Sequence, residues 1–122
     1  MSDLSQWHLR TFKADGTWGE IVDFWMPNAD SWQASLELDG WTEDACFGPG
    51  WIFGVSIYAK YNEEKEGAEY IAYVENADRF DAFYLPDSPA MLAFLRFAAP
   101  IVRMAYREDE RLEKESEDEQ DG

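Results

Sequence analysis

The chain has 122 residues, of which 26 are Asp or Glu and 10 are Lys or Arg, so its formal net charge is −16. That length suits one domain, and 46% hydrophobic with 16% aromatic residues is enough for a core, which argues against wholesale disorder. The charge argues against binding to DNA, RNA or an anionic membrane face, because each of these would repel the protein's own field.

Alternation of apolar and polar residues, interrupted by turn residues, predicts about six strands, over residues 7–13, 18–26, 31–38, 51–61, 69–75 and 79–85. The pair Asp15-Gly16 predicts a tight hairpin, because Gly accepts the positive φ that such turns require. Residues 31–38 alternate cleanly, as a half-exposed antiparallel strand does. Residues 39–50 are predicted to be an irregular connection. Both faces of 51–61 are apolar, which indicates a central strand.

After Pro86 the spacing of the apolar residues changes from the two-residue period of strands to the period of a helix. Ser88 is a good N-cap and Pro89 suits the first helical position. Apolar residues then recur at three- and four-residue spacing up to Tyr106, which predicts one amphipathic helix, kinked near Pro100. The predicted fold is therefore α+β: a curved antiparallel meander of about six strands with one C-terminal helix packed on one face.

Residues 108–122 hold nine acidic and two basic side chains. We therefore predict a single domain over 1–107, followed by an acidic segment over 108–122 that extends the helix and ends in disorder.

Compartment and targeting are inferred from what the sequence lacks. Cys46 is the only cysteine, so no internal disulfide forms. Residues 1–20 have neither the apolar run nor the cleavage site of a signal peptide. The stretches 48–59 and 88–103 are low in charge but shorter than the roughly 18–20 apolar residues of a spanning helix. These features predict a cytoplasmic protein.

Motifs for metal, nucleotide or catalytic chemistry are missing from the sequence, so no cofactor and no metal are expected. His8 is interpreted as a surface residue and Cys46 as a small buried hydrophobe; a His8–Cys46 dyad is a remote alternative. Asp78 and Asp81 flank Phe80 and would suit an acid–base pair, but a turn position and an exposed strand position explain them more simply. The protein is therefore predicted not to be an enzyme.

The 20 aromatic residues leave two interpretations open. Either the sheet curls over a dense core, or an aromatic face inside an acidic rim remains for a partner. The acidic residues also concentrate in the turn after residue 61 and in the C-terminal segment. The magnitude of −16 exceeds the roughly 2–8 charges that solubility requires of a small domain.

The first functional hypothesis is a non-enzymatic inhibitor or decoy that binds the basic, nucleic-acid-binding surface of another protein. Carboxylates would replace phosphates against Lys and Arg. In general character the chain resembles phage-encoded blockers of host defence, such as anti-CRISPR or anti-restriction proteins, and immunity proteins of nuclease toxins. The predicted partner-binding residues are Glu63, Glu64, Glu66, Glu69, Asp78, Asp81, Trp41, Glu108 and Glu110. The alternative is a small-ligand-binding domain or a carboxylate-based enzyme with an aromatic-lined cup.

Overall fold

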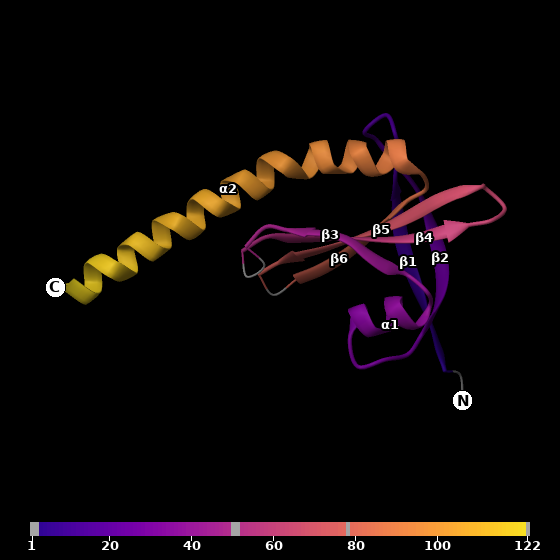
Figure 1. Cartoon of the computed structure of the whole chain (residues 1–122), viewed down its shortest axis with the longest axis horizontal. Coiled ribbons are helices and arrows are strands. Elements are labelled where there is room, and N and C mark those ends of the chain that lie inside the picture. Colours follow the sequence, from indigo (N-terminus) through magenta and orange to yellow (C-terminus); the bar gives the residue numbers. More distant parts are fainter. Residues whose placement is uncertain (1–2, 50–51, 78, 122) are drawn as a thin grey trace.

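The structure is a computed structural model that describes residues 3–49, 52–77 and 79–121, with side chains up to residue 115. Its elements, in chain order, are β1 Leu4–Phe12, β2 Trp18–Pro27, α1 Trp32–Leu38, β3 Thr42–Phe47, β4 Gly54–Asn62, β5 Gly67–Asn76, β6 Arg79–Leu85 and α2 Ser88–Asp121. The fold is α+β, as predicted. Six strands form one curled sheet, with α2 on one face and α1 on the other (Figure 1).

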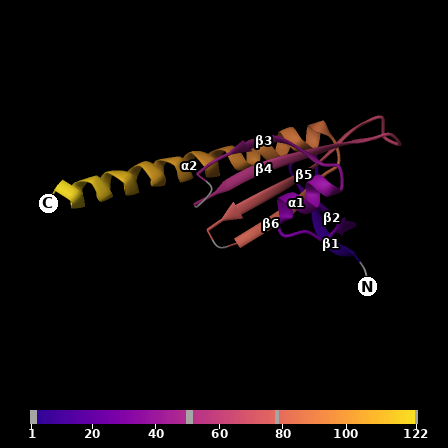
Figure 2. The ribbon, with the colours of Figure 1, turned by 60° about the horizontal axis from the view of Figure 1, so that its bottom comes forward.

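The sheet is mixed, whereas the sequence predicted an antiparallel meander. The strand order is β2-β1-β6-β5-β4-β3, and β1 pairs parallel with β6 through Arg10 with Phe83 and Thr11 with Tyr84. All other neighbours are antiparallel. The parallel contact arises because the β3–β6 meander ends beside β1 instead of continuing from β2. Figure 2 shows the β3–β6 strands side by side.

Residues 31–38 form a helix and not the predicted strand. The Ser31 side chain accepts a hydrogen bond from the Ala34 N–H, which caps α1, and Gly40 has φ +93° just beyond the C-cap. Leu36 is fully buried on this helix. The chain instead supplies its remaining strand from the segment predicted to be irregular, where 42–47 pairs with β4.

The predicted hairpin at Asp15-Gly16 and the predicted turn after residue 61 are both present. At the first, Gly16 has φ +84°, and the Asp15 carboxylate accepts hydrogen bonds from the Thr17 N–H (3.0 Å) and hydroxyl (2.6 Å). At the second, the Asn62 side chain accepts hydrogen bonds from the Glu64 and Lys65 N–H groups. Each turn is thus closed by an Asx side chain, as its sequence indicates.

Helix α2 begins one residue away from the predicted cap. Asp87 supplies the capping carboxylate to the Ala90 N–H at 2.8 Å, while the Ser88 hydroxyl hydrogen-bonds that of Tyr70. Pro100 lies within the helix, and the axis of α2 bends in Figure 1 between the part above the sheet and the part that projects beyond it. The helix continues across residue 107 to Asp121, so no break in the backbone marks the predicted domain boundary.

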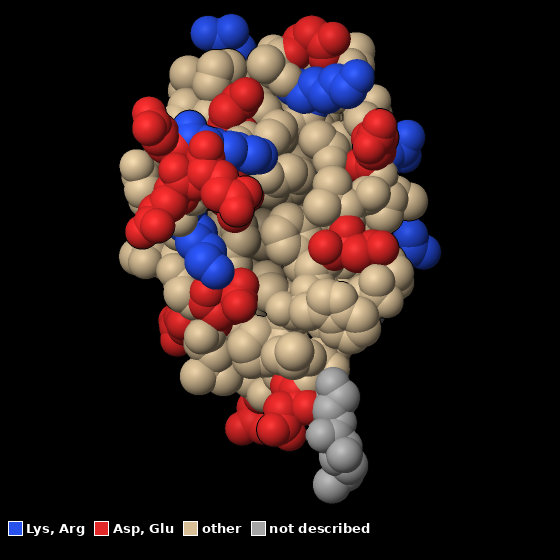
Figure 3. Space-filling model, turned by 90° about the vertical axis from the view of Figure 1, so that its right-hand side faces the viewer, with Lys and Arg blue, Asp and Glu red and all other residues tan. Residues whose placement is uncertain are grey.

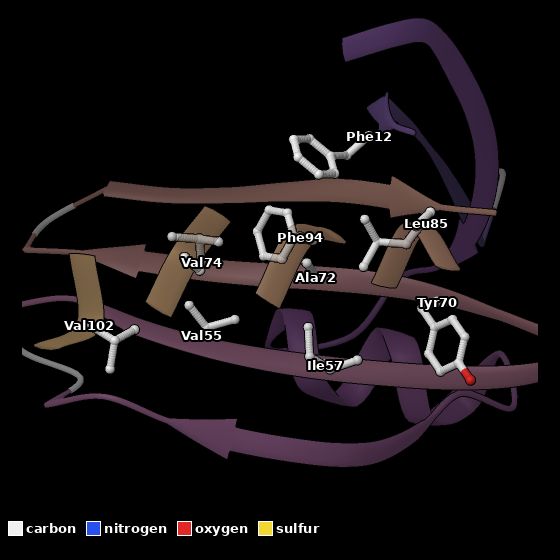
Figure 4. Close-up of a cluster of buried hydrophobic side chains, with 11 residues drawn as sticks. Phe12, Val55, Ile57, Tyr70, Ala72, Val74, Leu85, Phe94 and Val102 are labelled. Atoms are coloured by element: carbon white, nitrogen blue, oxygen red, sulfur yellow. The ribbon is translucent and has the colours of Figure 1, made fainter. Parts of the chain in front are cut away.

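The core has one layer on each face of the sheet. The layer under α2 contains Phe12, Ile57, Val74, Leu85 and Phe94 among others, and Figure 4 shows Phe94 lying over the strands from the helix side. The second layer, under α1, is formed by Leu9, Met26, Leu36, Trp41, Tyr58, Ile71 and Tyr84. Residues 51–61 were predicted to form a central strand covered on both sides; β4 is an inner strand next to the edge strand β3, and its residues 55–58 are buried on both faces.

The part of α2 with described side chains, Ser88–Glu115, is long and apolar enough to span a membrane by length and composition, contrary to the sequence-based expectation. This is weak evidence for a membrane span, because core helices of soluble proteins share these properties. Phe94, Ala98 and Val102 are buried, which accounts for part of the apolar content. A cytoplasmic location stays a prediction.

Candidate functional site

The turn between β4 and β5 carries the most exposed group of predicted contact residues. Glu63, Glu64 and Glu66 are all exposed at its tip. Lys65 folds back, and its Nζ donates a hydrogen bond to the Tyr84 hydroxyl at 3.0 Å. This bond raises the pKa of Lys65, so the ammonium group stays charged and held against the sheet. The turn therefore presents three carboxylates to solvent without the neighbouring ammonium group between them.

Glu69 lies behind this turn in a structural role. It is half-buried, and its carboxylate accepts a hydrogen bond from the Tyr84 hydroxyl at 2.8 Å. Burial raises the pKa of Tyr84, which keeps the phenol protonated and able to donate. Glu69 thus orients the Lys65–Tyr84 pair that fixes the turn, and its negative charge lies behind the carboxylates at the tip of the turn.

Trp41 does not fit its predicted role as a contact residue. Its side chain is only 3% exposed, and its Nε1 donates a hydrogen bond to Asp39 at 2.9 Å. Lys60 also hydrogen-bonds Asp39 and lies over the Trp41 ring at 5.7 Å. Trp41 therefore fills the core beneath α1 and offers no ring to a partner, because the buried strand β4 and α1 cover it.

Asp81 and Glu108 lie on one groove, although they are far apart in sequence. One hollow of about 220 Å³ is lined by Asp81 together with Trp18, Phe83, Phe94 and Phe97. A second of about 300 Å³ is lined by Glu108, Ile52, Met104 and Ala105. Both are also lined by Phe53, Asn76 and Ile101, so they adjoin beside α2.

The walls of this groove form a connected aromatic cluster. Phe12 contacts Trp18, Phe94 and Phe97 with ring centroids 5.0–5.6 Å apart, and Trp18 lies 5.0 Å from Phe83. Edge-to-face and tilted arrangements of this kind fix ring positions. The sequence predicted the helix that carries Phe94 and Phe97, but it did not place these two residues on the packed face. Nothing local in the sequence indicated that Trp18 would meet them.

The other helical candidates differ from each other. Glu108 is paired with Arg111, which lowers the pKa of its carboxyl group, whereas Glu110 is exposed and forms no ion pair in the described part of the chain. Asp78 lies outside the described residues.

The predicted residues therefore do not form one surface. The β4–β5 turn and the projecting part of α2 lie at opposite ends of the molecule (Figure 1), and Asp81 lies on the groove. The face shown in Figure 3 carries separate groups of acidic side chains, with basic side chains beside them and a broad uncharged area between.

Charge is instead segregated along the chain. Residues 14–59 contain eight Asp or Glu and no Lys, Arg or His. This stretch supplies β2, α1 and β3, so it includes both edge strands of the sheet. The pattern is visible in the sequence, but its meaning depends on the strand order.

Among the described residues, no cysteine and histidine lie close enough together to act as a nucleophile and its base. His8 is exposed, as predicted, and its Nδ1 lies 2.5 Å from the Asp23 carboxylate on the neighbouring strand. Cys46 is exposed on β3, against the prediction of burial, and its sulfur accepts a hydrogen bond from Ser56 at 3.5 Å. With three strands between β1 and β3, His8 and Cys46 form no dyad.

Comparisons with known proteins gave no relatives. No family model, no curated protein and no solved structure matches the chain.

Proposed function

We propose that the protein is a non-enzymatic inhibitor that occupies a basic, nucleic-acid-binding surface of a partner protein. The observation that carries this proposal is the segregation of charge: a stretch of 46 residues, 14–59, with eight carboxylates and no base, in a chain of net charge −16. A concentration of negative charge of this kind accelerates encounter with a basic partner and disfavours binding to nucleic acid itself.

The β4–β5 turn is the most accessible place for the first contact. Its three exposed carboxylates are held on a hairpin whose base is fixed by the Lys65–Tyr84–Glu69 hydrogen bonds. Such preorganisation lowers the entropy lost on binding. The partner is accordingly a nuclease or another nucleic-acid-binding protein, of the kind that defence systems and nuclease toxins employ.

The test compares two charge-reversed variants of equal net charge. Glu63, Glu64 and Glu66 changed to Lys takes the chain from −16 to −10, and Glu110, Glu113 and Glu115 changed to Lys does the same at the far end of the molecule. Association is measured by stopped flow with purified basic nucleases, at about 50 mM salt, where screening is weak.

The proposal expects binding that duplex DNA displaces, and an association rate reduced by roughly 10-fold or more in the turn variant but less in the helix variant. Equal slowing in both variants would assign the effect to the overall field and remove the turn from the contact. Binding that salt and duplex DNA leave unchanged would overturn the decoy function.

The groove supports a second candidate, a small-ligand-binding function. Its aromatic walls and the Asp81 and Glu108 carboxylates suit an apolar ligand that carries an amine. Because Trp18 lines the groove, titration with decylamine should shift the tryptophan fluorescence of the protein, and Trp18→Phe should remove that shift. Asp81→Asn should weaken the effect, while decanoate gives none. An identical response to decylamine and decanoate would exclude a role for the carboxylates.

A further inference from the structure

We propose that the outer edge of β2 binds an extended, basic segment of the partner as an additional strand of the sheet. This inference rests on the proposed function and assigns it a mode of binding. Strand addition draws its affinity from main-chain hydrogen bonds and its specificity from alternate side chains.

The two edges of the sheet differ in how well they are protected. β3 has six residues, and its register with β4 shifts between Glu43 and Ala45. β2 has ten residues; its register with β1 shifts between Trp18 and Ile21, and it then pairs regularly from Ile21 to Pro27. In the part of the chain that the structure describes, no strand covers its outer edge. Edge strands are normally shortened, bulged or provided with Lys or Pro, which discourages pairing. Between Ile21 and Pro27, β2 has no Lys, one carboxylate at Asp23, and a proline only at its last position.

The side chains of β2 fit a basic strand. On the face away from α1, Ile21, Asp23 and Trp25 alternate, and Ile21 and Trp25 are 66% and 60% exposed. An incoming strand with apolar residues opposite Ile21 and Trp25 and a Lys or Arg opposite Asp23 completes this face. Cross-strand pairs of this type are stabilising, whereas like charges opposed across strands are not.

Charge selects a basic partner segment over a second copy of this chain. β2 contains Glu20 and Asp23 and no basic residue. Two copies paired through β2 would therefore bring like charges together, in chains that each carry −16. Three bases lie beside β2: His8 is paired with Asp23, Arg10 lies 5.2 Å from the Trp18 ring, and the Lys13 side chain lies beside Gly19.

The experiment uses a fluorescently labelled synthetic peptide of the same length as β2, in which Lys and Val alternate. Its binding to the full chain is measured by fluorescence anisotropy. Three comparators have the same length: a peptide with its Val residues N-methylated, one with the Lys residues grouped at one end, and one with Glu in place of Lys. N-methylation removes the donors that strand pairing needs and leaves the charge unchanged.

Two protein variants of equal net charge complete the design. Ile21→Lys with Trp25→Lys blocks the edge, and Glu113→Gln with Glu115→Gln lies on the projecting part of α2; each takes −16 to −14. The alternating peptide should bind at least about 10-fold more tightly than the N-methylated and grouped peptides, and the edge variant should lose a similar factor while the helix variant changes less than about 2-fold.

Equal binding of the N-methylated peptide would overturn the proposal, and it does so with the unaltered protein, whether or not the edge variant folds. Equal losses in the two variants would also overturn it, as would self-association through β2 that the peptide reverses. Failure here is separable from failure of the proposed function, because the edge variant can still bind and inhibit a basic nuclease through the turn.

Discussion

Replacing Phe94 by Ala tests whether α2 is docked as the groove requires. Phe94 is 2% exposed, and its ring lies 5.5 Å from Phe12, 5.9 Å from Phe83 and 6.2 Å from Phe97. Loss of a buried Phe side chain costs about 3–5 kcal/mol of unfolding free energy. Phe94 also borders the hollow of about 220 Å³, so the space left by its ring opens to solvent and is hydrated. The expected loss is therefore at the low end, about 3 kcal/mol.

The assay is urea unfolding monitored by tryptophan fluorescence, with Phe97→Ala as the matched control. Phe97 is 48% exposed on the same helix, so its loss should cost about 1 kcal/mol. Equal losses for the two variants, or a loss below about 1 kcal/mol for Phe94→Ala, would show that the helix does not pack on the sheet in this register.

Three further predictions concern single residues. Burial, reinforced by Glu43, raises the pKa of Tyr58 from 10.0 to about 12. The protonated phenol therefore stabilises the fold below about pH 10, and this stability, roughly 2–3 kcal/mol, is lost as the pH rises through 12. In urea titrations at alkaline pH, Tyr58→Phe should remove that part of the loss. Ser31→Ala should cost about 1 kcal/mol in the same assay, because it removes the cap that accepts from the Ala34 N–H; no change would mean that α1 is held by Leu36 alone. Cys46 should react with a disulfide reagent in the folded protein as fast as in urea, and strong protection would contradict its exposure.

Short-range signals in the sequence predicted the hairpins and the long helix. Asp15-Gly16 and Asn62 act through turn chemistry that involves only their neighbours, and α2 shows a stripe sustained over several turns. Local features of this kind are readable because their partners lie within a few residues.

The α1 segment shows why alternation alone misleads. Its apolar residues alternate like a strand, yet Ser31 before it and Gly40 after it are the cap and stop residues of a helix. With only seven residues, the two periods are hard to distinguish, and the packing of Leu36 beneath β1 and β4 decides the outcome.

The groove could not have been predicted, because it depends on the strand order. Trp18 meets Phe83 only because β1 pairs with β6, and a parallel pair between the first and last strands has no local signal. Asp81 and Glu108 line the same groove because α2 packs on β5 and β6, while the carboxylates of the β4–β5 turn remain at the far end.

Strand order also decides how the charge pattern bears on function. Net charge attracts any basic body and specifies no contact, whereas a stretch without bases matters according to where the fold places it. Here the stretch 14–59 supplies both edge strands of the sheet. The bases that follow it lie elsewhere: Lys60 is on the inner strand β4, Lys65 is in the turn between β4 and β5, and Arg79 is on the inner strand β6. A basic segment that approaches an edge therefore meets carboxylates and free main-chain groups together. Of the two edges, only β2 combines this charge with a regularly paired run, from Ile21 to Pro27, and with exposed apolar side chains. An incoming strand therefore gains hydrogen bonds, ion pairs and apolar contacts in one register.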